Sequence, residues 1–106
     1  MKYNVKAQLD DFDLGIIAYL RIDGAMNPIQ YFPLAASAIN YLQKNNVISK
    51  LERRECAEYF CQKFTSMLRP ATVSQSVIDQ TIALMVNQKD TVKEFGGILA
   101  AMKFAR

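Results

Sequence analysis

The stretch TVSQSVIDQTIALMVNQ, residues 72–88, carries a single charge, on Asp79, and places apolar side chains at helical spacing. At about 100° per residue, these side chains form two arcs on roughly opposite sides of a helix. A helix that is apolar on two sides needs neighbours on both, so we predict that this helix lies in the middle of a helical domain. The arcs are Val73, Val77 and Leu84 on one side and Ile78, Ile82, Met85 and Val86 on the other.

The whole chain has the size and composition of one folded domain. At 106 residues it can bury roughly two-thirds of its unfolded surface, which is enough for a core without metal or disulfide support. A composition that is 51% hydrophobic and 22% charged is unlike that of disordered chains. We therefore predict a single domain, residues 1–106. The net charge of +3 is far below that of a strong nucleic-acid binder.

Local start signals divide the remaining sequence into helices. An N-cap residue followed three positions later by Glu or Gln predicts a helix start, because the two side chains can close a capping box. Four such pairs occur: Asn27 with Gln30, Ser49 with Glu52, Thr72 with Gln75, and Thr91 with Glu94. They predict an all-α bundle of about five helices, near residues 5–22, 28–44, 50–68, 72–88 and 92–105.

Two points in this pattern are ambiguous. Residues 1–9 alternate apolar and polar side chains like a strand, yet Val5 and Leu9 also share the helical arc of Phe12 and Ile16. A lone strand would have no partner, so we favour a helix from about Val5, with a start at Asp10 as the alternative. In the second helix, Pro33 has no N–H to donate, which predicts one helical turn followed by a kink.

The sequence offers no recognisable catalytic or metal-binding chemistry. It lacks histidine, the commonest general base and metal ligand. Cys56 and Cys61 would lie on one helix about 140° apart, which prevents a disulfide between them. No nucleophile–base pair and no glycine-rich phosphate loop is present. We therefore expect no enzyme activity, no cofactor and no metal site.

The same features set the expected location. No signal peptide is visible, and the longest uncharged run, residues 24–43, contains too many polar residues and prolines to span a bilayer. We expect a cytoplasmic protein with reduced cysteines and no membrane association.

Protein binding is the function that these observations favour. Tyr59 stands on the charged side of the helix predicted at residues 50–68, and tyrosine is enriched at interface anchors. An acidic segment near the N-terminus would suit a basic partner. Small helical proteins of this type are common among adaptors, inhibitors and toxin-neutralising immunity proteins, although no motif links this chain to any of them. The candidate partner-binding residues are Asp10, Asp11, Asp13, Glu52, Glu55, Tyr59 and Lys63.

Two alternatives remain open at this point. Residues 38–60 have the order of a helix-turn-helix motif, and Lys50, Arg53 and Arg54 stand where a recognition helix presents side chains to DNA. Interspersed glutamates argue against DNA, as does the apolar side to which Arg53 points. The second alternative is self-association through a notch of small residues between Gly96 and Ala101.

Overall fold

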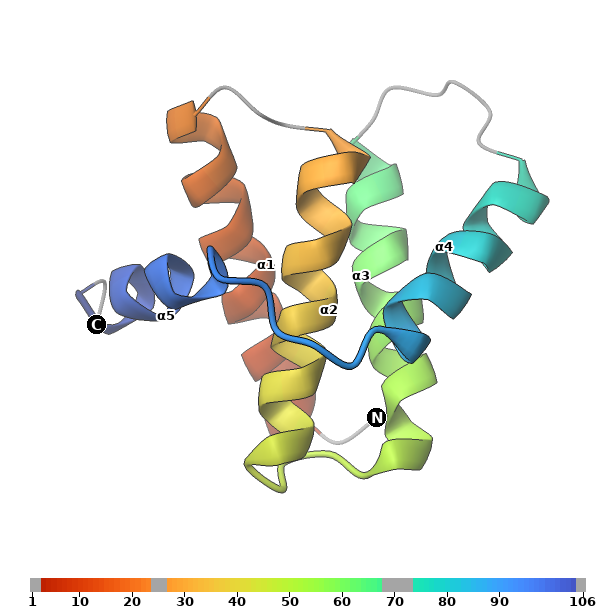
Figure 1. The fold of residues 1–106 in the computed structure, drawn as a ribbon, viewed down its shortest axis with the longest axis horizontal. Coiled ribbons are helices and arrows are strands. Elements are labelled where there is room, and N and C mark those ends of the chain that lie inside the picture. Colours follow the sequence, from red (N-terminus) through yellow and green to blue (C-terminus); the bar gives the residue numbers. More distant parts are fainter. Residues whose placement is uncertain (1–2, 24–26, 68–73, 105–106) are drawn as a thin grey trace.

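The computed structural model describes residues 3–23, 27–67 and 74–104. Within these ranges the chain is an all-α compact globule with no strands, which confirms the predicted fold class (Figure 1). Its Cα radius of gyration, 13.0 Å, is that expected of a compact chain of about 100 residues. The elements are α1 (Tyr3–Asp23), α2 (Pro28–Lys44), the 3₁₀-helix η1 (Lys50–Glu52), α3 (Arg53–Met67), α4 (Gln75–Asn87) and α5 (Phe95–Phe104).

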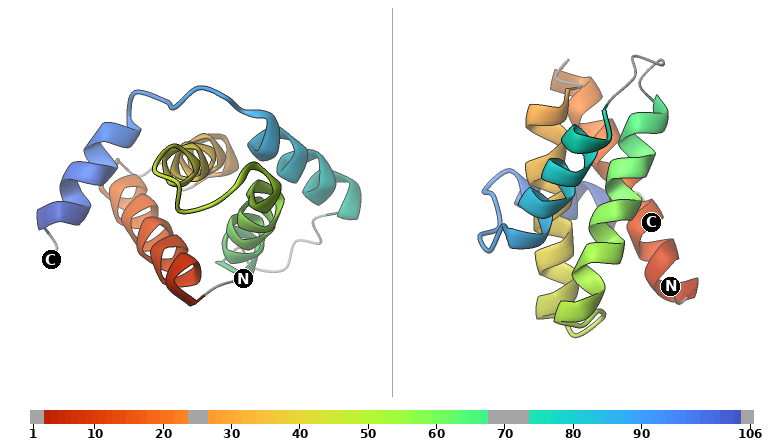
Figure 2. Two further views of the ribbon diagram at one scale, coloured as in Figure 1. Left: turned by 90° about the horizontal axis from the view of Figure 1, so that it is seen from below. Right: turned by 90° about the vertical axis from the view of Figure 1, so that its right-hand side faces the viewer.

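The central helix is α2. It packs against α1, α3, α4 and α5, whereas α4 and α5 lie at opposite edges of the molecule (Figure 2). Ala35, Ala36 and Ala38 are completely buried, and their small side chains let neighbouring helices approach from several directions. Larger side chains of the same helix, Ile39 and Leu42, complete the core.

The prediction that residues 72–88 form the central helix is wrong. In α4 only the arc containing Ile82 and Met85 is buried, against α2 and α3. The opposite arc faces solvent, since Val77 is 50% and Leu84 73% exposed. The two-sided apolar pattern therefore marks one face that packs inside the molecule and another that the described residues leave uncovered.

The core faces of α1 and α3 follow the predicted periodicity. α1 begins at Tyr3, so the helix expected from about Val5 is confirmed and the alternative start at Asp10 is wrong. The ring of Phe64 packs against that of Tyr31, which is itself fully buried, with ring centroids 4.6 Å apart and the ring planes tilted by 38°. The buried side chains of these two helices include Val5, Leu9, Phe12, Ile16, Ile17 and Leu20 in α1, and Cys56, Ala57, Phe60, Cys61 and Phe64 in α3.

The predicted helix starts hold in part. The Asn27 side chain caps α2 by accepting from the Gln30 N–H at 3.1 Å, and the Glu52 side chain accepts from the Ser49 N–H at 2.9 Å. Residues 50–52 form a 3₁₀-helix before α3, and α2 continues as one helix through Pro33. α4 is capped by Ser74, whose side chain accepts from the Val77 N–H, while Thr72 lies outside the described residues.

The connection between α4 and α5, residues 88–94, crosses over α2 (Figure 1). The Ser37 hydroxyl accepts from the Val92 N–H at 2.9 Å and donates to the Pro33 carbonyl at 2.9 Å. These two bonds satisfy the Ser37 hydroxyl, which is completely buried. α5 begins at Phe95 and not at the predicted residue 92; residues 93 and 94 form a turn, in which the Phe95 N–H donates to the Val92 carbonyl at 3.1 Å.

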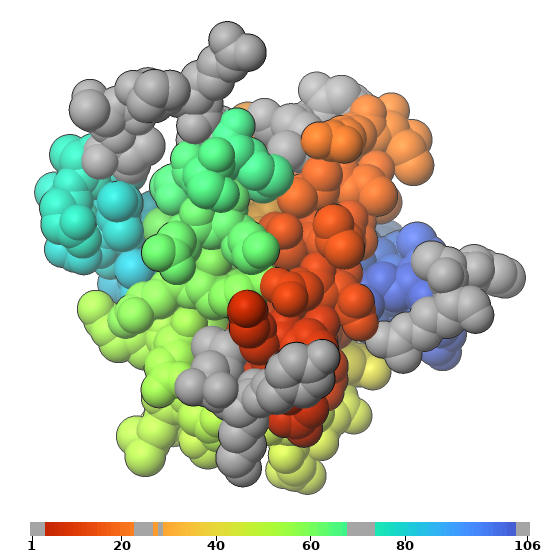
Figure 3. All heavy atoms as spheres, turned by 180° about the vertical axis from the view of Figure 1, so that it is seen from behind, coloured from red at the N-terminus to blue at the C-terminus, as the bar shows by residue number. Residues whose placement is uncertain are grey.

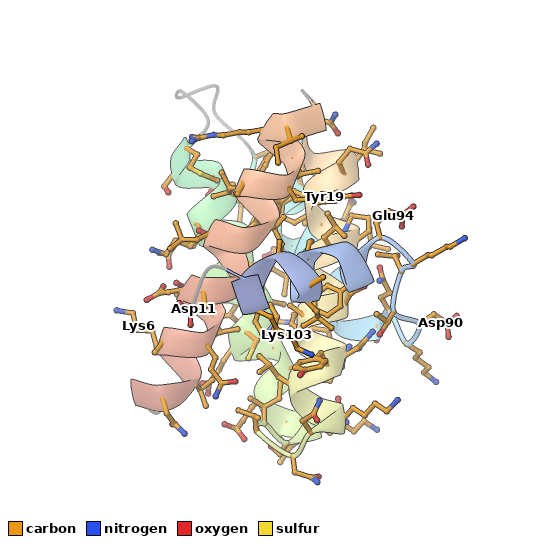
Figure 4. All side chains as sticks on the ribbon, turned by 90° about the vertical axis from the view of Figure 1, so that its left-hand side faces the viewer. Lys6, Asp11, Tyr19, Asp90, Glu94 and Lys103 are labelled. Atoms are coloured by element: carbon orange, nitrogen blue, oxygen red, sulfur yellow. The ribbon has the colours of Figure 1, made fainter. Side chains whose placement is uncertain are left out.

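The predicted small-residue notch of α5 is only partly covered. A Cβ added to Gly96 would meet nothing within 4 Å, so this position of the notch does not pack against another helix. The close approach occurs at Gly15 of α1, where an added Cβ would lie 3.2 Å from Cγ of Met102. Tyr19 of α1 lies beside Gly97 near the start of α5, as Figure 4 shows for the tyrosine. Gly15 therefore lets α5 lie close against α1.

Candidate functional site

An apolar groove of about 530 Å³ runs between the first half of α2 and the second half of α4. Ile29 of α2 and Leu84 of α4 line it from the two helices, and they are 81% and 73% exposed. Large aliphatic side chains that share a groove are a more specific signal than isolated ones, which are normal on protein surfaces. The remaining lining residues are Phe32, Pro33, Thr81, Met85, Asn87 and Gln88.

The buried guanidinium of Arg53 holds α4 in place beside α2. It donates through Nε to the Val86 carbonyl at 3.1 Å and through Nη2 to the Gln88 carbonyl at 3.0 Å and the Met85 carbonyl at 3.4 Å. Its Nη1 donates to Oε1 of Gln43 at 2.8 Å. The last carbonyls of a helix have no hydrogen-bond partner inside the helix, and a positive charge is stabilised near them by the helix dipole. Arg53 therefore caps α4 from α3.

A second hollow, of about 840 Å³, lies where the ends of α2 and α4 meet the beginning of α3. The charged side chains that line it are all basic: Lys44, Lys50, Lys89 and Arg53. We call this hollow the basic pocket. Its lining also includes Asn40, whose buried Nδ2 has no hydrogen-bond partner among the described residues. Asn87 borders both the basic pocket and the apolar groove.

The three predicted N-terminal aspartates do not form one acidic surface. Asp13 is buried, at 6% exposed, and its Oδ1 accepts a hydrogen bond from the hydroxyl of the buried Tyr31 at 2.5 Å. Its place in a partner-binding patch is therefore a wrong prediction, because the carboxylate faces the core. Asp10 lies 3.7 Å from Nζ of Lys63 in α3, and Asp11 is exposed on α1 near Lys103 of α5 (Figure 4).

Tyr59 of α3, the helix that lies beside α1 in Figure 3, is half-buried and packs against the core. It packs edge-on against Phe60, with ring centroids 5.7 Å apart, and Nζ of Lys63 lies 5.5 Å from its ring centre. The prediction of Tyr59 as an exposed anchor is wrong, because its ring packs against the core. The structure does bring Asp10, Tyr59 and Lys63 together. Glu55 is exposed on α3, and the Glu52 side chain serves the cap at Ser49.

The residues of the DNA-binding alternative are also separated. Arg53 is 7% exposed and hydrogen-bonded within the molecule, so it is not presented to a DNA groove. Arg54 is exposed, and its Nε lies 3.2 Å from the carboxylate of Glu58. Lys50 is exposed and lines the basic pocket. The proposed recognition helix thus retains two of its three basic side chains on the surface.

The phenol of Tyr31 and the thiols of Cys56 and Cys61 are held in their neutral forms in the interior. Burial and the hydrogen bond with Asp13 raise the pKa of Tyr31 well above its ordinary value. Burial, with the nearby charges of Glu52 and Glu55, raises the pKa of Cys56 to about 11, and burial raises the pKa of Cys61. Both cysteines are free thiols. Because burial raises the pKa of each, neither has the lowered pKa that marks a reactive nucleophile.

These shifts predict that the protein loses stability in alkali. Below about pH 9 the folded and unfolded states both keep these protons, so the free energy of unfolding is insensitive to them. Between about pH 9 and 11 the unfolded thiol of Cys56 ionises while the folded one does not, and the unfolded Tyr31 follows from about pH 10. The free energy of unfolding should then fall by up to about 1.4 kcal/mol per pH unit for each proton.

Urea denaturation at pH 8, 9, 10 and 10.5 measures this dependence. Cys56→Ala is the matched control, since it removes one of the two main contributions and should flatten the profile between pH 9 and 10. A wild-type profile that is level to pH 10.5 would contradict the assignment of these groups as buried and neutral.

The described residues contain no group of three or more His, Cys, Asp or Glu side chains that could hold a metal ion. In the same part of the chain, no helix is long and apolar enough to cross a membrane. Comparisons with family models, with curated proteins and with solved structures find no match to this chain.

Sequence reasoning did not identify the apolar groove. The available signal was the second apolar arc of residues 72–88, which includes Leu84, but it was interpreted as a second packing face. Ile29 lies one residue after the predicted helix start at Pro28, and nothing local distinguishes its exposure from burial. The basic pocket combines residues from three separate segments, so spacing along the chain cannot reveal it.

Proposed function

We propose that this chain is a non-enzymatic protein-binding module whose groove between α2 and α4 receives an apolar segment of a partner protein. The observation that carries the proposal is the exposure of Ile29 and Leu84 along one apolar groove. Grooves between two helices are a recurrent binding mode for amphipathic helices, whose anchors repeat at i, i+3 or i+4, and i+7.

The support is energetic as well as geometric. Leaving a large aliphatic side chain in water forgoes roughly 1.5–3 kcal/mol that its burial would provide. Two such side chains on one groove are therefore favourable contacts for a partner, and they can be covered without any rearrangement of the core. A partner held here would have part of its own surface blocked, which is how an inhibitor of the immunity type acts.

Site-specific photo-crosslinking in the native host tests the proposal. A photoreactive phenylalanine analogue replaces Leu84 in the groove or, as the matched control, Leu14 of α1, which is 65% exposed and lies outside the groove. We expect a discrete protein adduct from position 84 and none from position 14. Leu84→Glu should weaken binding of the captured partner at least tenfold, because it places a charge at an apolar contact.

Two results would contradict the proposal: no adduct from position 84, or the same set of adducts from both positions. Circular dichroism of Leu84→Glu provides the folding control. The helical signal should be unchanged, since residue 84 is mostly solvent-exposed.

A further inference from the structure

The apolar groove and the basic pocket adjoin each other at the C-terminal end of α4. Asn87 lines both hollows. Along α2, the groove is lined at residues 29–33 and the pocket at residues 40–44. The first groove residue of α2, Ile29, and its first pocket residue, Asn40, are eleven residues apart, which corresponds to about 16 Å along the helix. A bound helix of three to four turns can therefore reach from the groove to the pocket.

The charges along this path have one sign. Lys44, Lys50 and Lys89 are exposed around the basic pocket, and no acidic side chain lines it. Asp90 follows Lys89 on the connection to α5 but is not part of the lining. The guanidinium of Arg53 is bonded to carbonyl and amide oxygens, and neither ion pair found among the described residues includes it. Within the described ranges, Arg53 therefore forms no ion pair with a carboxylate.

Helix stabilisation does not account for all of these lysines. Lys44 lies in the last turn of α2, where a cation complements the helix dipole. Lys50, however, is the first residue of η1, immediately before α3, and a cation at a helix start is unfavourable. The carbonyls at the end of α4 are already bonded by Arg53, which leaves Lys89 without that role.

A polar group in the pocket also lacks its counterpart. Nδ2 of Asn40 is buried and has no acceptor among the described residues, although a buried donor normally has one. This nitrogen is itself inaccessible, so the charges, and not Asn40, favour a ligand in the pocket. A carboxylate bound there would neutralise part of the positive charge of Lys44, Lys50 and Lys89.

We infer that the segment bound by this protein is an amphipathic helix with an apolar face for the groove and carboxylates at one end for the basic pocket. This inference rests on the proposed function and adds the chemistry of the partner. It reverses the sign expected from the sequence, where the N-terminal aspartates suggested a basic partner.

Fluorescence anisotropy with designed peptides tests the inference. The probe is an 18-residue fluorescein-labelled helix with leucines at i, i+4, i+7 and i+11 and four glutamates in its C-terminal turns. A second peptide carries the glutamates in its N-terminal turns, and in the control peptides lysines replace the glutamates. We expect one of the acidic peptides to bind at 50 mM salt, the lysine peptides to bind at least tenfold more weakly, and the difference to shrink in 0.5 M salt.

Protein variants locate the contact. Lys44→Glu combined with Lys89→Glu should weaken the acidic peptide at least tenfold, and the neutral pair Lys44→Gln with Lys89→Gln should weaken it less. The matched control is Lys6→Glu with Lys103→Glu, which makes the same change in net charge on α1 and α5 (Figure 4). We expect this control to bind like the wild type, apart from a small long-range effect.

The outcomes separate the two proposals. Equal binding of acidic and basic peptides that is abolished by Leu84→Glu would overturn the inference and leave the proposed function standing. No binding of either acidic peptide would also overturn the inference, while the adduct at position 84 decides the proposed function independently. Binding of a 20-base-pair DNA duplex with the same dependence on Lys44 and Lys89 would overturn the inference and assign the basic pocket to nucleic acid.

Discussion

Replacing Arg53 with Met should lower the free energy of unfolding by about 3 kcal/mol. Arg53 is 7% exposed and supplies hydrogen bonds to the carbonyls of Met85, Val86 and Gln88. Without them, the C-terminal carbonyls of α4 lose their only charged partner among the described residues. Bonds from charged donors contribute more than neutral ones, and buried acceptors that lose their donor remain desolvated.

Chemical denaturation of three variants measures this effect. Arg53→Met keeps much of the aliphatic packing, and Arg53→Lys keeps the charge but cannot form the forked set of bonds, so its loss should be intermediate. The matched control is Arg54→Met, which removes a surface ion pair with Glu58 and should change stability by less than about 1 kcal/mol. Equal effects at positions 53 and 54 would show that the cap on α4 contributes little.

The Arg53 variant also bears on function. α4 provides one wall of the apolar groove, so loosening its C-terminal end should weaken partner binding even though Arg53 does not line that groove. Leu84→Glu should instead weaken binding without loss of stability. Comparing the two variants therefore distinguishes a residue that holds α4 in position, Arg53, from one that contacts the partner, Leu84.

Tyr31→Phe should destabilise the protein by roughly 3 kcal/mol, because it removes only one oxygen but leaves the carboxylate of Asp13 buried without its partner. The phenol and the carboxylate lie between α1 and α2, and both side chains are nearly inaccessible to solvent. The ring itself still packs against Phe64, so the loss would come from the hydrogen bond and from the unpaired charge.

A double-mutant cycle distinguishes this origin from general damage to the core. Asp13→Ala alone leaves the Tyr31 hydroxyl buried and unpaired, which should cost about 1–3 kcal/mol. The double variant Tyr31→Phe with Asp13→Ala removes both polar groups, and its loss should be well below the sum of the single losses. Strict additivity in urea denaturation would contradict a coupled buried pair.

The sequence predicted those features of the fold that depend on neighbours three or four residues away. Asn27 and Ser49 lie where capping chemistry requires a polar side chain, and the core face of α3 follows from its own periodicity. α4 ends at Asn87, one residue before the predicted end, and the free thiols of Cys56 and Cys61 were predicted on the same local grounds. The all-α class follows from the agreement of these signals.

Local pattern was insufficient where a residue's environment comes from another helix. Asp13 and Tyr31 are 18 positions apart, and Arg53 meets carbonyls 32 to 35 positions further along the chain. From the sequence, Asp13 is one of several acids near a helix start and Arg53 one of several basic residues. Their burial depends on which helices pack together, and the residues next to Asp13 and Arg53 in the sequence do not indicate this.

The sequence by itself determined that this chain forms helices, where α2 and η1 begin and which faces of α1 and α3 are apolar, because capping and periodicity act within one or two turns. Only the tertiary structure decided that α2 is central and α4 peripheral. The alanines of α2 give a weak hydrophobic pattern, yet their small size lets other helices pack on several sides. The stronger pattern of α4 includes apolar side chains that its neighbouring helices leave uncovered. Ile29 and Leu84 are exposed for that reason, and the proposed binding groove is a product of packing.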